Sequence, residues 1–408
     1  MADTKKIKVV WICHFYEKGL GAKLPLRKYG DEFAPWVRDL IEHFKKKPEV
    51  ELYIISPMEY LKTNVVRYTE ENISYTFFNA HIPIWGRHWP GFFKWDFFTR
   101  FKRNRRFISR EVDKINPDII NLIGAENAYY SASILDLKDR YPHLVTIQGF
   151  IHLNNGQGKQ YDVKCDIEKK ILSSCKNFAY QINHTADIIK GFNSKAILYQ
   201  NFLPISIQAG DIVNSPEQYN YDFVFFARVT KDKGIEDLIK ALSLVKTVNP
   251  KVRMAIIGNA SQAYLEFLKQ LTIENNVENN IDWLGFLPTQ KEVHHVVASS
   301  KITILPTYND IISGTIIESM FIKTPVIAYG VGGIPDLNNQ VEVIKVVEKG
   351  NVKMLSQKMS ELLLNNKSQR RLANEAYKKA TQIFDNSKVY SKMMSIYKDI
   401  IKNNKNEN

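Results

Sequence analysis

Short runs of β-branched and other apolar residues alternate with amphipathic segments along most of this chain, and this alternation limits its fold more than any other feature. The run IKVVWIC at 7–13 is followed by the helix-like PWVRDLIEHFKKK at 35–47 and then by VELYIIS at 50–56. Parallel strands need a crossover connection, which is usually a helix. The alternation therefore predicts an α/β protein in which helices cover both faces of a parallel sheet.

The alternation stops near residue 205 and then restarts, which indicates two domains in series. Between them, residues 204–220 are polar, contain two prolines and show no periodicity, so we interpret them as a linker. We predict a Rossmann-like first domain over 1–205, a Rossmann-like second domain over 206–385 and a final helix over 386–408, with the return of that helix to the first domain as an open alternative. Open α/β sheets bind ligands at the carboxyl ends of their strands, so we expect the site in a central cleft that two doubly wound sheets face.

The net charge and the cysteines limit the binding partners and the cellular compartment to be expected. A net charge of +13 predicts attraction to a phosphorylated substrate, a membrane surface or nucleic acid. Cys13, Cys165 and Cys175 show no Cys-x-x-Cys spacing, which indicates neither a disulfide framework nor a zinc site and suits a reducing cytoplasm. No apolar stretch approaches the roughly 18 to 20 residues of a membrane span, so we expect any membrane contact to be peripheral.

Two acids flank a predicted helix start in the stretch PTYNDIISGTIIESM at 306–320. A helix start attracts phosphate through its free backbone N–H groups. Glu318, about one turn into the helix, and Asp310, on the loop before it, are placed to accept hydrogen bonds from sugar hydroxyls. Two other interpretations stay open from the residues alone, namely a turn cap with a surface helix residue, and a glycosidase acid/base pair. The residues at the helix start are Ser313, Gly314 and Thr315.

A basic pair follows the first predicted strand of the second domain. Arg228 and Lys233 lie in FFARVTKDKG at 225–234, in a loop before a helix that begins near Gly234. Two cations there would neutralise a diphosphate and stabilise the charge on a departing one. The alternative is that Lys233 is a solvated loop lysine.

Five segments occur in the order and spacing of a known family: FFARVTKDKG, MAIIGN, IDWLGFLP, ITILPTYNDIISGTIIESM and TPVIAYGVGGIPDL. Over roughly residues 221–340 the chain resembles the second domain of the GT-B glycosyltransferases of family 4, which carry an Arg and a Lys in the first loop and a Glu-x7-Glu pair in the later one. The first half is more loosely similar to bacterial members that build surface polysaccharides, through VVWICHFY, PDIINLIGAEN and VTIQGF.

The resemblance implies a role for each of these residues. Arg228 and Lys233 would bind the donor diphosphate, Glu318 the ribose and Asp310 hydroxyls of the transferred sugar. The phosphates would also meet backbone donors of the helix start, and Phe286 would lie near the base. A glycine-rich loop against the phosphates is implied at Gly19 and Gly21.

Two positions depart from the family pattern. Asp310 stands where the family usually has Glu, so a different sugar or a shifted pose is expected. Gln148 stands where many members have a histidine near the donor sugar, and a glutamine cannot act as a general base. His152 is either a substitute for that histidine or a polar loop residue.

The most basic stretch, at 85–110, interleaves aromatic residues with eight Arg and Lys residues and a single acid, Asp96. Such a segment is typical of an interface with an anionic membrane, where a lipid-linked acceptor would be met. The alternative is a helix with aromatics in the core and solvated arginines. No recognised nucleic-acid module accompanies it, so we expect no nucleic-acid partner.

Together these features predict a metal-independent, retaining glycosyltransferase that uses a UDP- or GDP-sugar, needs no cofactor and acts on a saccharide or lipid-linked acceptor in bacterial surface-polysaccharide synthesis. We expect it in the cytoplasm, with peripheral contact at the inner membrane face as an option. The chain lacks any Asp-x-Asp metal motif. Two alternatives stay open: a nucleotide-sugar epimerase of the same architecture, and a non-catalytic protein that binds sugar nucleotides or membranes.

Overall fold

The protein divides into two compact units, Met1–Pro204 with Ser387–Asn408 and Ile205–Asn386. The structure is a computed structural model, and it describes residues 6–15, 23–26, 35–58, 61–80, 82–84, 87–89, 95–154, 156–205, 207 and 219–407. Helix α15 (Asn386–Glu407) belongs to the first unit apart from its first residue. The predicted boundaries at 205 and 385 therefore lie beside those of the structure.

The first unit is built on an eight-stranded sheet in the order β10-β9-β8-β7-β1-β2-β4-β3. Neighbouring strands are parallel, except that β3 runs antiparallel to β4. The strands are β1 (Ile7–Ile12), β2 (Val50–Pro57), β3 (Val65–Glu70), β4 (Ile73–Phe78), β7 (Ile119–Ile123), β8 (His143–Thr146), β9 (Asn177–Tyr180) and β10 (Ile197–Gln200), with β5 (Ile82–Ile84) and β6 (Arg87–Trp89) in a separate pair. The helices are α2 (Pro35–Lys45), α3 (Trp95–Phe98), α4 (Lys102–Ile115), α5 (Ala128–Ser131), α6 (Ile134–Leu137), η2 (Ile151–Leu153), α7 (Lys159–Ser174) and α8 (Asn183–Phe192).

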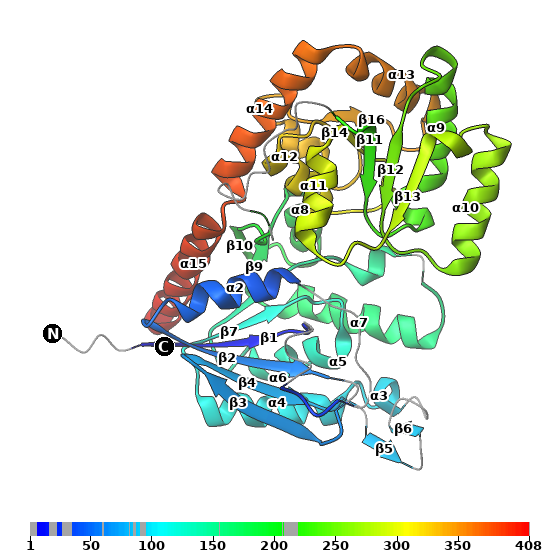
Figure 1. The fold of residues 1–408 in the computed structure, drawn as a ribbon. Helices are drawn as coiled ribbons and strands as arrows, with labels where there is room; N and C mark the ends of the chain where they lie inside the picture. The colour runs from blue at the N-terminus through cyan, green and yellow to red at the C-terminus, as the bar shows by residue number, and fades with distance from the viewer. Residues whose placement is uncertain are drawn as a thin grey trace. The chain divides into compact units, whose positions relative to one another are not determined.

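Both faces of this sheet are covered because its central strands are apolar on both sides. In β1, Val9 and Trp11 belong to the core under α2 and α15, whereas Val10 and Ile12 belong to the core under α4 and α7. Successive side chains of a strand point to opposite faces, which explains the division. Figure 1 shows α2 and α15 on one face of the sheet and α4 and α6 on the other.

Helix α15 is fastened to the sheet by a buried tyrosine. The Tyr397 hydroxyl accepts hydrogen bonds from Trp11 Nε1 at 3.0 Å and from Asn121 Nδ2 at 2.7 Å. Tyr390 lies edge-on to Phe44 of α2, with ring centroids 4.8 Å apart. The apolar face of α15, between Tyr390 and Ile400, thus enters the core of the first unit.

The second unit has a fully parallel six-stranded sheet in the order β13-β12-β11-β14-β15-β16. Its strands are β11 (Tyr221–Phe226), β12 (Met254–Ile257), β13 (Ile281–Gly285), β14 (Ser300–Leu305), β15 (Val326–Tyr329) and β16 (Lys345–Val347). Its helices are η3 (Lys231–Lys233), α9 (Ile235–Val248), α10 (Gln262–Glu274), η4 (Glu278–Asn280), α11 (Gln290–Ala298), α12 (Gly314–Ile322), η5 (Pro335–Asn338), α13 (Val352–Leu363) and α14 (Asn366–Ile383).

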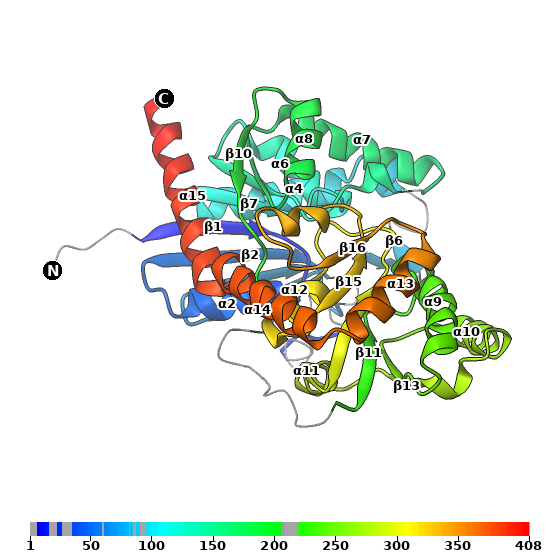
Figure 2. The same ribbon diagram turned by 90° about the horizontal axis from the view of Figure 1, so that it is seen from above.

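Numbered within the unit, this strand order is 3-2-1-4-5-6, the doubly wound dinucleotide-binding order. From β11 the chain adds β12 and β13 toward one edge of the sheet. It then returns to place β14 on the other side of β11 and adds β15 and β16 toward the opposite edge. Helices α9 and α10 lie on one side and α11 and α12 on the other (Figure 1), while α12 and α14 lie side by side (Figure 2). The order reverses between β11 and β14, and ligands of such sheets bind outside the carboxyl ends of those strands.

None of the helices in the described part of the chain combines the length and apolar character that crossing a bilayer requires. The three cysteines are free and buried. Burial raises the pKa of the Cys175 thiol to about 12, so this thiol stays protonated at neutral pH.

We expect Tyr397→Phe to destabilise the first unit by about 1 to 3 kcal/mol, because it leaves the buried donors of Trp11 and Asn121 without their acceptor. The measurement is the denaturant midpoint followed by tryptophan fluorescence. Tyr219→Phe is the matched control, since that tyrosine is 42% exposed. Equal midpoints for the two variants would contradict the role of Tyr397 as the fastening of α15.

Candidate functional site

The loops that leave β11 and β14 are joined by an ion pair at the switch point of the second sheet. Lys233 Nζ lies 2.6 Å from Asp310 Oδ2, and the two side chains are only 11% and 19% exposed. Lys233 ends the short helix η3, two residues before the first residue of α9. The alternative of a solvated loop lysine is therefore wrong, because the ammonium is largely buried against a carboxylate.

Two glycines allow the neighbouring loops to approach Asp310 this closely. Gly234 has φ +75°, and a Cβ there would lie 1.9 Å from the Pro306 carbonyl oxygen at the end of β14. Gly332 has φ +53°, and a Cβ there would lie 1.9 Å from the Asp310 carbonyl oxygen. A side chain at either position would push apart the loops that hold the ion pair. The GVGG segment at 330–333 thus supports the loop of Asp310.

Glu318 is held on α12 by two residues of α11. Its Oε2 accepts hydrogen bonds from Gln290 Nε2 at 2.7 Å and from His294 Nε2 at 3.0 Å. The Glu318 and His294 side chains are 13% and 8% exposed, so Glu318 is not a plain surface helix residue. Its Oε1 lies 3.8 Å from where a Cβ on Gly314 would stand, which places the carboxylate over the first residue of α12.

The predicted helix start is the start of α12. Ser313 is its N-cap residue and makes no side-chain capping bond, and Gly314 is exposed. The Thr315 hydroxyl donates to the Phe226 carbonyl oxygen at 2.7 Å, which ties the first turn to the end of β11. The first-turn N–H groups of α12 therefore lie at the carboxyl edge of the sheet, where an anion would meet the positive end of the helix dipole.

Arg228 and Phe286 lie on the loops of the same sheet edge. Arg228 follows β11 by two residues, is exposed, and forms no ion pair with any residue that the structure describes. Phe286 directly follows β13 and is 60% exposed. Both side chains are accessible to a ligand.

In the first unit, the carboxyl edge of the sheet gathers Gln148 and a group that sequence reasoning missed, Glu126. Gly124, with φ +87°, lies between them, since a Cβ there would be 3.0 Å from Gln148 Oε1 and 2.8 Å from Glu126 Oε1. Glu126 Oε2 has no hydrogen-bond partner among the described residues. Burial raises the pKa of Glu126 to about 7. The only signal for Glu126 in the sequence was its position in IGAEN at 123–127, at the carboxyl end of β7.

His152 is anchored rather than loose. Its Nδ1 lies 2.5 Å from Oε2 of the fully buried Glu168. Glu168 also accepts the backbone N–H groups of Ile151 and His152, at 2.8 and 3.0 Å. The contacts therefore favour a structural task for this nitrogen, namely holding η2 against α7.

Gly19 and Gly21 lie outside the described residues. The sequence also did not reveal a contact between His14, two residues after β1, and Tyr129 of α5. The Tyr129 hydroxyl lies 3.0 Å from His14 Nδ1. Burial lowers the pKa of His14 to about 4. In the described ranges, no group of three or more His, Cys, Asp or Glu residues is placed to hold a metal ion.

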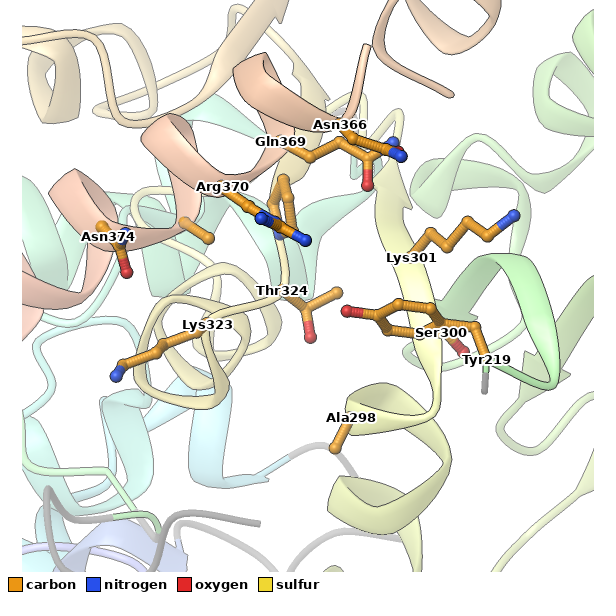
Figure 3. A pocket seen from close by; sticks show the side chains of 12 residues that line it. Tyr219, Ala298, Ser300, Lys301, Lys323, Thr324, Asn366, Gln369, Arg370 and Asn374 are labelled. Atoms are coloured by element: carbon orange, nitrogen blue, oxygen red, sulfur yellow. The ribbon is translucent and has the colours of Figure 1, made fainter. Parts of the chain in front are cut away.

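A separate hollow of about 490 Å³ lies at the opposite, amino-terminal edge of the second sheet. Figure 3 shows Arg370, Thr324 and the Tyr219 hydroxyl directed toward its middle, while the ammonium groups of Lys301 and Lys323 point away. Lys301 is paired with Asp222 at 2.8 Å, and Lys323 lies over the Tyr377 ring at 4.5 Å. Because Lys233, Asp310 and Glu318 lie at the carboxyl edge, this hollow is not part of their site.

The raised pKa of Glu126 predicts a specific pH dependence of stability. The unfolded carboxyl ionises near pH 4.5 and the folded one near pH 7, so the folded state binds more protons in between and its stability falls as pH rises through this window. We expect Glu126→Gln to gain about 2 kcal/mol relative to the wild type between pH 5 and pH 7. Denaturant midpoints at both pH values measure this gain. A constant difference between the two proteins would show that the carboxyl titrates normally.

Comparison with known proteins assigns the second unit. Residues 212–379 match the family described as glycosyl transferases group 1. The chain is 23% identical over 190 residues to the capsular polysaccharide biosynthesis glycosyltransferase CapM of Staphylococcus aureus, covering 45% of this chain and 47% of that protein. It is 23% identical over 232 residues to the N-acetyl-alpha-D-glucosaminyl L-malate synthase of Bacillus anthracis, covering 55% and 59%. The chain thus spans about half the length of these curated relatives.

Solved structures show the fold over nearly the whole chain. Sucrose-phosphate synthase from Thermosynechococcus elongatus matches with a TM-score of 0.74 at 15% identity, covering 97% of this chain and 99% of that one. HepE of Anabaena, solved in complex with UDP and glucose, matches with a TM-score of 0.69 at 13% identity, covering 96% and 100%. The predicted fold is confirmed, because the chain shares the GT-B fold of these solved structures. The predicted resemblance is confirmed over residues 212–379, which match the glycosyl transferases group 1 domain.

Proposed function

We propose that the protein transfers a sugar from a UDP- or GDP-linked donor to a hydroxyl of a saccharide or lipid-linked acceptor, with retention at the anomeric carbon. One observation carries the proposal: the ion-paired Lys233 and Asp310 lie at the switch point of a group 1 domain that also holds Glu318 over the start of α12. Cations, a helix start and hydrogen-bond acceptors for sugar are the groups that a nucleotide-sugar requires.

Each residue of this site has a proposed task. Arg228, Lys233 and the N–H groups of Ser313, Gly314 and Thr315 would bind the diphosphate. Glu318, fixed by Gln290 and His294, would accept the ribose hydroxyls. Asp310 would hold Lys233 toward the phosphate and accept a hydroxyl of the transferred sugar with its remaining lone pairs. Phe286 would face the base, and this set of groups needs neither a metal ion nor a cofactor.

The proposed reaction breaks the bond between the anomeric carbon and the diphosphate oxygen, and forms a bond from the acceptor oxygen on the same face of the sugar. The acceptor proton passes to the leaving phosphate oxygen, so no protein nucleophile is needed. Lys233, Arg228 and the dipole of α12 would stabilise the negative charge that grows on the leaving nucleoside diphosphate. Gln148, which cannot titrate, would only donate or accept a hydrogen bond on the acceptor side.

We place this activity in the synthesis of a bacterial surface polysaccharide, in the cytoplasm and in part at the inner face of the membrane. The sequence likeness to CapM, which is described as a capsular polysaccharide biosynthesis enzyme, supports the first part. Structures of HepE and of TarM from S. aureus contain UDP, which supports UDP as the nucleotide.

A nucleotide-sugar epimerase is the second candidate, because Glu126, with its pKa raised to about 7, is a group able to exchange protons near neutral pH. The two activities differ in their products. An epimerase converts the nucleotide-sugar into its epimer, with the configuration inverted at one carbon of the sugar, and consumes no acceptor. A protein that only binds sugar nucleotides would release nothing.

We expect Glu318→Ala to raise the dissociation constant of the donor at least about tenfold, because it removes a charge-assisted acceptor of the ribose. Lys233→Met should lower the rate of donor hydrolysis more than it lowers affinity, because the charge on the leaving group grows in the transition state. Calorimetry measures the affinity, and proton NMR of the released sugar measures both the rate and the anomeric configuration. Glu274→Ala, at an exposed glutamate of α10, is the control.

Release of the α-anomer first from an α-linked donor would support retention, and release of the β-anomer would contradict it. Absence of donor binding and of hydrolysis across UDP- and GDP-sugars, with no effect of Glu318→Ala, would overturn the transferase proposal. Conversion of the donor into its epimer would favour the second candidate.

A further inference from the structure

The basic aromatic segment of the sequence forms a groove in the first unit that the sugar-transfer site does not use. Of this segment, Trp85, Gly86 and residues 90–94 lie outside the described residues, and the described part includes α3 and α4. A hollow of about 500 Å³ runs along α4 and the ends of β3 and β4. We call it the α4 groove, and its lining residues are Asn64, Val65, Phe78, Asp96, Thr99, Lys102, Arg103, Arg106, Phe107 and Arg110.

Three cations of the groove have no ionic partner among the residues that the structure describes. Lys102, Arg106 and Arg110 follow one another at spacings of four residues, so they share one face of α4. All three are exposed, and none forms an ion pair with a described residue. Exposed like charges in a row repel one another, so the arrangement costs stability unless an anion approaches.

Arg100, Arg103 and Arg105 of the segment have structural partners. Arg100 pairs with Asp166 at 2.9 Å, and Arg105 pairs with Asp136. Arg103 donates through Nη1 to the carbonyl oxygens of Asn79 and Ala80, both at 3.1 Å. The unpaired charges are thus confined to the groove rather than spread around the helix.

Among the described lining residues there is one acid, and it is buried. Asp96 is 2% exposed, and burial raises its pKa to about 6, an effect that the nearby charge of Arg103 opposes. Its charge therefore offsets Arg103, and the positive charge of Lys102, Arg106 and Arg110 is left for a ligand.

Apolar side chains also line part of the groove, and an exposed phenylalanine lies close to it in the sequence. Val65, Phe78 and Phe107 line it, and Phe107 packs against Phe78 with ring centroids 4.9 Å apart. Phe98, between the lining residues Asp96 and Thr99, is 91% exposed, more than any other large apolar side chain of the described chain. An exposed aromatic beside a row of cations is the composition of a segment that lies at a membrane interface.

We propose that the α4 groove binds the phosphate of an anionic lipid headgroup, with Lys102, Arg106 and Arg110 on the phosphates and Phe98 in the acyl boundary. A small soluble phosphate would leave Phe98 in water, whereas a bilayer covers it. Single-stranded nucleic acid needs exposed aromatic faces on which bases stack, and the aromatics inside this groove are already packed. The inference deepens the membrane part of the proposed function, but vesicle binding does not depend on sugar transfer, so each can fail without the other.

The test is co-sedimentation of the full chain with vesicles of phosphatidylglycerol and phosphatidylcholine, compared with vesicles of phosphatidylcholine alone. We expect binding to the anionic vesicles only, weakening as salt rises from 50 to 300 mM. The triple variant Lys102→Gln, Arg106→Gln, Arg110→Gln should bind about 100-fold more weakly. The matched control is Lys392→Gln, Lys398→Gln, Lys402→Gln, which removes the same net charge from exposed lysines of α15 and should change binding only slightly.

The variant Phe98→Ser tests the insertion of Phe98 into the bilayer separately from the attraction of the cations to the lipid phosphates. It should weaken vesicle binding several-fold while leaving the salt dependence unchanged, whereas Leu364→Ser, at a side chain that is 82% exposed on the second unit, should have no effect. Melting temperatures of all variants establish that each is folded. Equal losses in the two triple variants would overturn the proposal, since net charge alone would then explain binding. Failure to bind anionic vesicles, or binding of inorganic pyrophosphate in the groove without vesicle binding, would also overturn it.

Discussion

The ion pair between Lys233 and Asp310 is the contact on which the site of the second unit depends. The two residues are 77 positions apart in the sequence, and only the reversal of strand order between β11 and β14 brings their loops together. A largely buried ammonium loses hydration, and a carboxylate at 2.6 Å compensates for that loss. The pair therefore fixes a cation at the sheet edge, with Gly234 and Gly332 leaving room for the loops around it.

At this carboxyl edge of the second sheet, cations and hydrogen-bond acceptors lie on different elements. Cations stand on the loop after β11, hydrogen-bond acceptors stand after β14 and on α12, and the start of α12 lies between them. Glu318 is kept in place by Gln290 and His294, so the carboxylate does not swing toward Lys233. This separation suits a ligand that has a diphosphate in the middle and hydroxyl-bearing sugars on both sides of it.

The sequence predicted the architecture well because periodicity and strand composition report local structure directly. It predicted two α/β units, the start of α12 at Ser313 and the placement of Arg228 and Lys233 after β11. It did not reveal that Lys233 is buried, because burial depends on a partner far along the chain. The sequence did not identify His294, in the helical segment KEVHHVVAS at 291–299, as a partner of Glu318. Local sequence does not show that α11 packs against α12. Glu126 and Glu168 were missed for the same reason: their environments are made by neighbouring strands and helices.

The central claim is that the edge around Lys233, Asp310 and Glu318 binds a nucleotide-sugar. The most direct measurement is a thermal-shift screen of the full chain against a panel of UDP- and GDP-sugars, since a ligand of the native state raises the melting temperature. The account predicts a rise with members of one nucleotide class that disappears in Asp310→Asn and Glu318→Gln and persists in Glu126→Gln. A rise that these two substitutions leave intact, or no rise with any nucleotide-sugar, would contradict it.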